Sequence, residues 1–391
     1  MSTPRPIYLD YAATTPLDPR VAQAMHETML AGYANPASQH GAGRAARKIL
    51  EAARDGIARL LDAKTDCLDA DRLVFTSGGT EANNLALFGL AGSTPCRVLL
   101  SAIEHPSVTL AAEELGRRGF QVERIAVDTQ GVVDLVQLRL QLLRSPVPKL
   151  ASVILGNNET GVVQPVAEIS QLCHLHDVLL HCDAVQANGK LPLSFSQLQV
   201  DALTIAPHKF YGPLGIGALL LPHATPFEPQ LFGGFQQGGL RPGTESLPLI
   251  VGFHHAIELA IHHTPQASQI AELRDRFEQH LRASLTDIVI NCAGATRLPH
   301  ISNIAFRGVD RQQLFLALDF AGVYCSTGSA CASGSSEPSP VLRAMGLSEE
   351  VISSSLRFSF GLPTTASETE EAAKRIIKCV NDLRSRKTPR K

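Results

Sequence analysis

The sequence contains no tryptophan, and aromatic residues make up only 5% of its 391 positions. It also lacks a large excess of either charge, because it has 35 lysine and arginine residues and 37 aspartate and glutamate residues. The net charge of −2 argues against a nucleic-acid groove or an anionic membrane as the main partner. No run approaches the roughly 18 consecutive apolar residues of a membrane span, and Met1–Pro6 holds no apolar core of a signal peptide. We therefore expect a cytoplasmic protein with no direct nucleic-acid partner and no membrane partner.

The eight cysteines are scattered along the chain, unlike those of a small disulfide-rich domain. We interpret them as reduced thiols, which leaves open which one is reactive. One stretch, 173–182, carries two cysteines and three histidines and so has the letters of a metal site. However, His181 and Cys182 would point to opposite faces of a strand. We predict no metal site.

Short apolar segments alternate with helical patterns as far as Leu221. The apolar segments are rich in Val, Ile and Leu, which is typical of strands buried in a parallel sheet. Alternating strands and helices predict a mostly parallel sheet that is covered by helices on both faces. The expected strands are Arg72–Thr76, Arg97–Ser101, Gln121–Val127, Leu150–Leu155, Val178–Asp183, Asp201–Ala206 and Gly215–Leu221.

The pattern changes after about residue 245, where two long helical stretches precede shorter strands and helices. We predict an α/β fold with a large domain at residues 16–255, which holds the mixed sheet. Residues 1–15 and 256–391 would form a smaller α/β domain. Within it, Ser326–Ser339 is rich in small residues and has no period. A loop of that length inside a compact protein is more often functional than accidental.

Three polar features follow expected strands, at the sheet edge where α/β proteins bind ligands. Phe75–Thr80 ends one strand with two glycines before a helix, and the N–H groups of a helix N-terminus suit a phosphate. Asp183 ends a second strand. Lys209 follows a third strand in a turn that we expect to be partly buried, and burial favours the neutral amine that attacks carbonyls. Taken singly, a tight turn, a capping aspartate and a surface lysine would explain the same letters.

An anion site, a carboxylate and an amine together match the needs of pyridoxal 5'-phosphate (PLP). This cofactor requires an amine for its Schiff base, a carboxylate that keeps its ring nitrogen protonated, and a site for its phosphate. Because the three features share one edge of the expected sheet, we predict that the protein binds PLP.

A series of longer motifs follows nearly the whole chain in order: Tyr8–Pro16, Asn35–Ser38, Phe75–Asn84, Glu104-His105, Asn157–Gly161, His181–Gln186, His208–Gly217, Arg241–Thr244, Ser329–Cys331 and Leu356–Phe358. In these motifs the chain resembles the cysteine desulfurases, which are PLP enzymes of fold type I in the class V aminotransferase superfamily. The resemblance implies a large PLP-binding domain with a mostly parallel mixed sheet and a smaller C-terminal domain. The long loop around Cys331 is similar to that of the branch serving iron–sulfur cluster assembly and related sulfur donation.

The resemblance also implies a role for each matching position. Lys209 would carry PLP as a Schiff base and move the Cα proton of the substrate. Asp183 would pair with the pyridinium nitrogen, and Gln186 would bond the phenolic oxygen. His105 would stack on the ring and move protons.

The remaining implied contacts hold the phosphate and the substrate. Thr244 would reach the cofactor of the other subunit in a homodimer. Asn158 and Arg357 would bind the substrate carboxylate, for which a planar guanidinium is suited, and Asn158 would also contact the cofactor. The phosphate ligands would be Gly79, Thr80 and His208.

Cys331 is the predicted nucleophile, because a thiolate in a mobile loop can reach the substrate and then carry the product away. With L-cysteine as the substrate, Cys331 would take the sulfur as a persulfide and leave L-alanine. The sulfur would then pass to an acceptor protein, an iron–sulfur scaffold or a thiolation enzyme. Cys325, six residues earlier, is an alternative second thiol or disulfide partner.

One position departs from the family pattern. Relatives usually carry a hydroxyl as a phosphate ligand three residues before the lysine, where this chain has Ala206. A hydrogen bond to a charged group contributes roughly 1.5–3 kcal/mol, so we expect weaker PLP retention unless Thr204, Ser77 or a water compensates. Two alternatives stay open: a selenocysteine lyase or other Cβ–S lyase, and a PLP-binding sulfur-transfer scaffold with little turnover.

Overall fold

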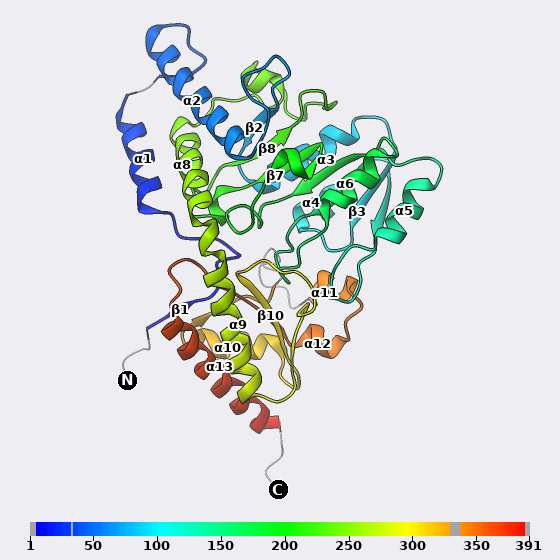
Figure 1. The fold of residues 1–391 in the computed structure, drawn as a ribbon, viewed down its shortest axis with the longest axis vertical. Coiled ribbons are helices and arrows are strands. Elements are labelled where there is room, and N and C mark those ends of the chain that lie inside the picture. Colours follow the sequence, from blue (N-terminus) through cyan, green and yellow to red (C-terminus); the bar gives the residue numbers. More distant parts are fainter. Residues whose placement is uncertain (1–4, 33, 329–336, 388–391) are drawn as a thin grey trace.

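The computed structural model describes residues 5–32, 34–328 and 337–387, and its core is a seven-stranded sheet (Figure 1). The strand order is β2-β8-β7-β6-β5-β3-β4, and only β8 runs antiparallel to its neighbours. The mixed, mostly parallel sheet predicted from the sequence is therefore confirmed. Its strands are β2 (Arg72–Thr76), β3 (Arg97–Ser101), β4 (Gln121–Ile125), β5 (Leu150–Ile154), β6 (Leu179–Asp183), β7 (Ala202–Ile205) and β8 (Gly217–Leu221).

Helices cover both faces of this sheet. Alternate residues of β3 serve the two faces, since Val98 and Leu100 pack in one apolar cluster and Leu99 packs in the other. The first face carries α3 (Gly79–Ala91) and α4 (Pro106–Arg117). The second face carries α2 (Gly41–Leu60), α5 (Leu135–Leu143), α6 (Val166–His174), α7 (Phe195–Leu198) and α8 (Leu247–His263), with α1 (Pro19–Leu30) against α8.

A second, smaller body lies below the first in Figure 1. It contains an antiparallel sheet in which β10 (Ile301–Phe306) lies between β9 (Ile288–Ile290) and β12 (Ser355–Ser359). The N-terminal β1 (Ile7–Tyr8) pairs with β11 (Val323–Tyr324), so the start of the chain belongs to this body. Its helices are α9 (Ala267–Ser284), α10 (Arg311–Phe320), α11 (Pro340–Ala344), α12 (Glu349–Ser353) and α13 (Ala366–Lys387).

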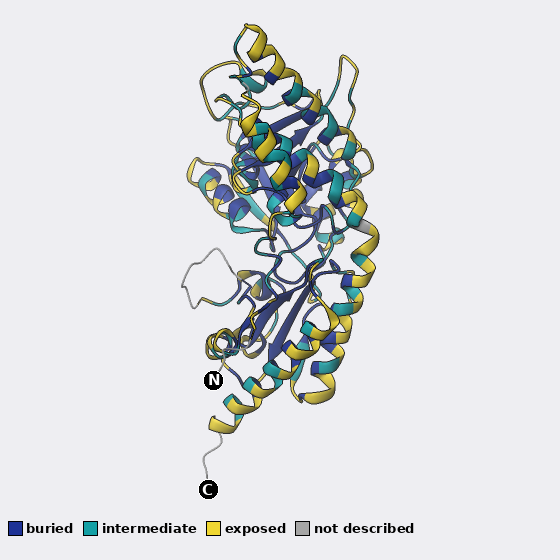
Figure 2. Ribbon diagram, turned by 90° about the vertical axis from the view of Figure 1, so that its left-hand side faces the viewer, coloured by how far each residue is buried: buried dark blue, intermediate teal, exposed yellow. Residues whose placement is uncertain are grey.

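Each body has its own apolar interior. Figure 2 shows buried strands inside both bodies and exposed residues on the outer sides of the helices. In the smaller body, the ring centroid of Phe277 lies 5.3 Å from the ring centroids of both Phe358 and Phe360. Helix α8 runs through position 255 without a break, so the boundaries expected at residues 15 and 255 stay a prediction.

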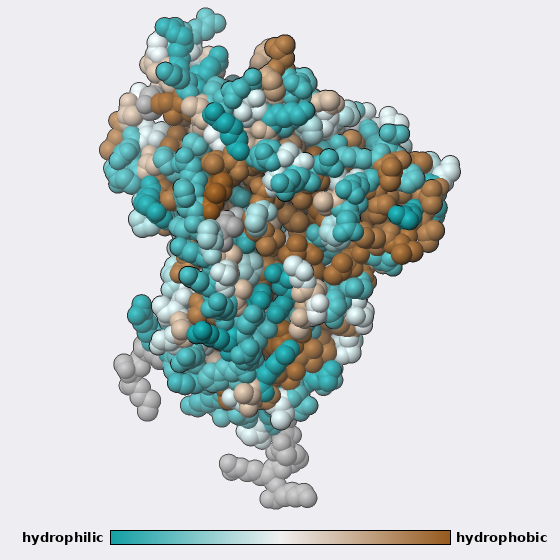
Figure 3. All heavy atoms as spheres, viewed as in Figure 1, coloured by the Kyte–Doolittle hydropathy of each residue, from teal (hydrophilic) through white to brown (hydrophobic). Residues whose placement is uncertain are grey.

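The surface carries one apolar area over α5, at the right of Figure 3. Val136, Leu140 and Leu143 of this helix are all exposed. Among the helices that the structure describes, none has the length and apolar character needed to cross a bilayer.

Candidate active site

The predicted site residues converge on the carboxyl ends of the parallel strands. Asp183 is the last residue of β6, and a 3-10 turn, η1 (Pro207–Lys209), follows β7. His105 follows β3 and caps α4, while Asn158 follows β5. Parallel strands bring these carboxyl ends to one edge, which is why the sequence spacing could predict the grouping.

Lys209 reaches from η1 to the N-terminal segment of the chain. Its Nζ donates to the backbone carbonyls of Ala12 at 2.9 Å and Ala13 at 2.7 Å. Gln186 Nε2 donates to the same Ala12 carbonyl at 2.8 Å. The amine is thus held by neutral acceptors near the turn that follows Asp183.

A hydrogen-bonded chain joins Asp183 to His105. Asn83 Nδ2 donates to Asp183 Oδ2 at 2.7 Å and to Ser107 Oγ at 2.8 Å, and Ser107 Oγ lies 2.8 Å from His105 Nδ1. Asp183 is 3% exposed, and its Oδ1 also accepts the N–H of Val185. Burial is the main cause that lowers the pKa of His105, so its ring is neutral at neutral pH. The chain therefore fixes a carboxylate and an imidazole in one rigid arrangement.

The N-terminus of α3 forms a close-packed anion cradle. A Cβ on Gly79 would lie 3.0 Å from Val185 Cγ2 and 3.6 Å from Ala206 Cβ. A Cβ on Gly217 of β8 would lie 2.6 Å from the backbone of Gly78. The glycines let β8 and the turn after β6 approach the free N–H groups that begin α3. Thr80, in the first turn, is exposed.

Two further predicted cofactor contacts, His208 and Thr244, lie in other segments of the chain. His208 Nδ1 lies 3.2 Å from Thr14 Oγ1, and burial, followed by the charge of Lys209, lowers the pKa of His208 to about 4. A neutral imidazole with its Nδ1 already bonded has Nε2 left for a ligand. Thr244 is exposed, next to Glu245, which forms a 2.7 Å ion pair with Arg54 of α2.

Thr204 is not available to replace the phosphate ligand that this chain lacks at Ala206. The Thr204 hydroxyl lies 3.0 Å from His181 Nε2 inside the sheet and is fully buried. His181 Nδ1 lies 2.9 Å from Ser152 Oγ. Thr204 therefore completes a buried network in the sheet, which leaves Ser77 or a water to replace the missing ligand. Within the described part of the chain, no three His, Cys, Asp or Glu residues group as metal ligands.

Arg357 anchors the other side of the site, on β12 of the smaller sheet. Its Nη2 lies 2.6 Å from Asp10 Oδ1, and its Nη1 donates to the Asn158 carbonyl at 2.8 Å. The side chain is 1% exposed. Its Nε and the Asn158 Oδ1 are buried and have no hydrogen-bond partner among the described residues. A donor and an acceptor without partners, one from each predicted substrate contact, are suited to a polar ligand.

The residues present fit PLP. A buried carboxylate, an amine, a neutral imidazole and an anion cradle that a Cβ at Gly79 would fill lie together on one edge. Asp183, Gln186, Gly79, His208 and Lys209 would hold the cofactor. Cys331, the predicted nucleophile, lies outside the described residues.

Comparison with known proteins explains this arrangement. The family model for aminotransferase class-V matches residues 7–371. The chain belongs to this family. It is 39% identical over 380 residues to a cysteine desulfurase IscS of Dictyoglomus turgidum, with 95% of each chain covered. It is 40% identical over 382 residues to a cysteine desulfurase of Cereibacter sphaeroides, with 97% of each chain covered.

Solved structures of the class-V family agree with the fold. A NifS-like protein from Rickettsia africae has a TM-score of 0.87 at 32% identity, covering 96% of this chain and all of its own. SspA in complex with cysteine has a TM-score of 0.78 at 31% identity, covering 90% of this chain and 98% of its own. The resemblance to cysteine desulfurases, the fold-type I architecture and the PLP dependence predicted from the sequence are thereby confirmed.

Sequence reasoning missed four polar residues of this class-V site. Asn83 joins Asp183 to His105 through Ser107, and Asp10 pairs with Arg357. Glu104 and Lys190 are almost fully buried, Glu104 near Asp183 and Lys190 against Lys209. Asn83 is a polar residue within an apolar helix, a signal that could have pointed to a buried contact. Asp10 gave no such signal, because its partner is 347 positions away.

Proposed function

We propose that this class-V enzyme transfers the sulfur of L-cysteine to Cys331 as a persulfide, releases L-alanine, and passes the sulfur to an acceptor protein. The observation that carries this proposal is the position of the two ends of the segment holding Cys331. Ser326 exchanges backbone hydrogen bonds of 2.7 and 3.0 Å with Arg357, and Ser339 Oγ donates to Glu159 Oε2 at 2.6 Å. Both ends thus adjoin the predicted carboxylate-binding residues, Asn158 and Arg357.

The residues of the chain divide the chemistry between them. Arg357 and Asn158 would bind the substrate carboxylate, to which the orphaned Arg357 Nε and the amide N–H groups of Asn158 can donate. Lys209 Nζ, released from the Ala12 and Ala13 carbonyls, would accept the Cα proton. PLP, when bound, supplies an electron sink that weakens the Cβ–S bond. His105, held by Ser107, would face the cofactor ring.

Cys331 would complete the sulfur transfer. Its thiolate attacks the substrate sulfur, an S–S bond forms, and the electrons of the broken Cβ–S bond take up a proton to give the methyl group of alanine. The pKa of each of the seven described thiols is raised, which favours the protonated and less nucleophilic form. Burial is the main cause for Cys325, which lies near Asp10 and Arg357 and is therefore a poor nucleophile.

We also propose that the protein is a cytoplasmic homodimer. Exposed Phe232 and Phe235 lie in the same segment as exposed Thr244, and two bare aromatic rings near a predicted intersubunit ligand support an interface there. Free cysteines throughout the described chain suit a reducing compartment. The acceptor, an iron–sulfur scaffold or a thiolation enzyme, would take the sulfur from Cys331.

The test compares Cys331→Ser with Cys325→Ser, its matched control six positions away. With L-cysteine, PLP and a reductant, the wild type and Cys325→Ser should form alanine and sulfide at similar rates. Cys331→Ser should lose at least about 100-fold in both products, and only it should lack a protein persulfide by mass spectrometry. Unchanged alanine formation by Cys331→Ser would refute the role of this thiol. A wild type that binds PLP but forms no alanine would favour the scaffold alternative, and faster turnover of selenocysteine would favour a lyase.

A further inference from the structure

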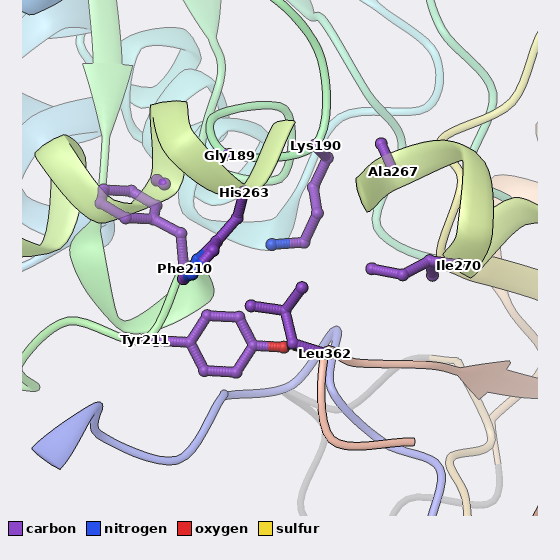
Figure 4. A pocket seen from close by; sticks show the side chains of 9 residues that line it. Gly189, Lys190, Phe210, Tyr211, His263, Ala267, Ile270 and Leu362 are labelled. Atoms are coloured by element: carbon purple, nitrogen blue, oxygen red, sulfur yellow. Dashed lines mark hydrogen bonds between the residues drawn. The ribbon is translucent and has the colours of Figure 1, made fainter. Parts of the chain in front are cut away.

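Lys190 is a buried lysine immediately behind Lys209. It is 5% exposed, and its Nζ donates to the backbone carbonyl of Lys209 at 2.9 Å. The ammonium also lies 5.8 Å from the ring centroid of Tyr211. In Figure 4 the Lys190 side chain points into a pocket formed by the end of α8, the turn after η1 and the segment around Leu362.

Among the described residues around Lys190 there is no compensating carboxylate. Apart from Lys190, the pocket is lined by glycine, alanine, isoleucine, leucine and aromatic residues, with His263 and Tyr211 as the other titratable groups. His300, fully buried with both ring nitrogens unbonded among the described residues, also feels the charge of Lys190. Lys209 is the charged residue whose positive charge acts on Lys190. No ion pair involving Lys190 occurs in the described chain.

An uncompensated buried ammonium is costly for folding. Burial, followed by the charge of Lys209, lowers the pKa of Lys190 to about 8. At neutral pH the group is still mostly charged, so the folded protein carries a positive charge in an apolar pocket. An apolar side chain of similar length would fill that pocket at lower cost. The lysine therefore calls for a reason other than stability.

We propose that Lys190 is a positioning residue for Lys209, which fixes the backbone of the η1 turn and places a positive charge behind the reactive amine. This inference rests on the proposed role of Lys209 as the PLP-binding lysine. A nearby positive charge disfavours protonation of the Lys209 nitrogen, whether free or bound to PLP. The titratable groups on which the charge of Lys209 acts are His208 in the same turn and His105 and His300 on other elements, and the pKa of each of these imidazoles is lowered. Arg357 and the Asp183 carboxylate both act on His105.

The test is a pH titration of the visible absorbance of PLP bound to Lys209. Removing the charge in Lys190→Met should raise the titration midpoint by roughly one pH unit. Lys190→Arg keeps the charge and a donor, so its midpoint should stay near that of the wild type. Lys149→Met is the matched control, because Lys149 also donates to a backbone carbonyl, that of Ala91 at 2.9 Å, but is exposed and remote from the site.

Stability measurements separate positioning from support of the fold. Lys190→Met should have a thermal midpoint equal to or above that of the wild type while its titration shifts. If Lys190→Met does not fold, Lys190→Gln, which removes the charge but keeps a donor, carries the same expectation. A folded, charge-free variant with the wild-type titration midpoint would overturn the inference. A wild type without lysine-bound PLP absorbance would instead refute the proposed function.

Discussion

The two sides of the site are held by different kinds of bond. On the cofactor side, the amine of Lys209 is held by the neutral carbonyls of Ala12 and Ala13. On the substrate side, the guanidinium of Arg357 is held by the Asp10 carboxylate at 2.6 Å. Lys209 can leave its acceptors without exposing a charge, whereas Arg357 cannot leave without uncovering Asp10. In these contacts the group proposed to move is held by neutral acceptors, and the group proposed to stay in place is held by an opposite charge.

The N-terminal segment connects these two sides. Asp10 pairs with Arg357, while Ala12 and Ala13, two and three positions later, receive Lys209. The segment also joins the smaller sheet, since Ala12 N donates to Ser359 Oγ at 2.9 Å. A short stretch of chain thus contacts both Arg357, the proposed carboxylate-binding residue, and the amine of Lys209.

Substitutions of Arg357 and of Lys209 should impair substrate binding and PLP binding separately. Arg357→Gln removes the charge proposed to bind the substrate carboxylate, so the KM for L-cysteine should rise about 10- to 100-fold, which corresponds to the loss of roughly 1.5–3 kcal/mol of charged hydrogen bonding. The visible absorbance of lysine-bound PLP should be retained. Lys209→Ala should abolish that absorbance. Loss of PLP from folded Arg357→Gln would show that the two sides are not separable.

The sequence predicted the cofactor side better than the substrate side. Asp183, the glycines before α3 and Lys209 each follow a strand, so the period of the strands and their parallel order were enough to group them. The seven strands of the large sheet were also predicted to within two residues at each end.

The substrate side depends on contacts that no local pattern reveals. Arg357 lies within an apolar strand, and its partners Asp10 and Asn158 come from two distant segments. The short elements β1, β11, α11 and α12 were also missed, because two to five residues are too few to show a period. The prediction of Arg357 rested on the family resemblance, and its ion pair with Asp10 required the fold.

A smaller effect is expected where the cofactor side departs from its relatives. Ala206 Cβ lies near the anion cradle, and Thr204 is engaged with His181, so Ala206→Ser should add the missing hydroxyl ligand. PLP should then bind about tenfold more tightly, measured as the dissociation constant of PLP from the apo protein. Ser77→Ala is the control for the alternative ligand. An unchanged constant in Ala206→Ser combined with weaker binding in Ser77→Ala would show that Ser77 already compensates.

Each side also contains one buried glutamate, and these differ in their partners. Glu159, on the substrate side, accepts from Ser339 and lies near Arg357 and Arg311, which oppose the effect of burial on its pKa. Glu104, on the cofactor side, has a buried Oε2 without a hydrogen-bond partner among the described residues, and Asp183 is nearby. Burial is the main cause that raises the pKa of Glu104 to about 8. Glu104 is thus protonated in the folded protein at neutral pH.

A pH-dependent effect on stability, without a direct effect on PLP or L-cysteine binding, follows from this protonation. An unfolded chain releases the Glu104 proton above its ordinary pKa of about 4.3, but the folded protein keeps it up to about pH 8. Between these values the folded state binds more protons, so the free energy of unfolding falls as the pH rises. Glu104→Gln lacks this titration and keeps an oxygen for Ser101 and the Ile154 N–H. Its stability relative to the wild type, from urea unfolding, should therefore become more favourable as the pH rises through this range, by at most about 1.4 kcal/mol per pH unit. Glu159→Gln should show a smaller pH-dependent gain, because Arg357 and Arg311 already favour its charged form. A pH-independent difference for Glu104→Gln would mean that Glu104 is ionised in the folded protein.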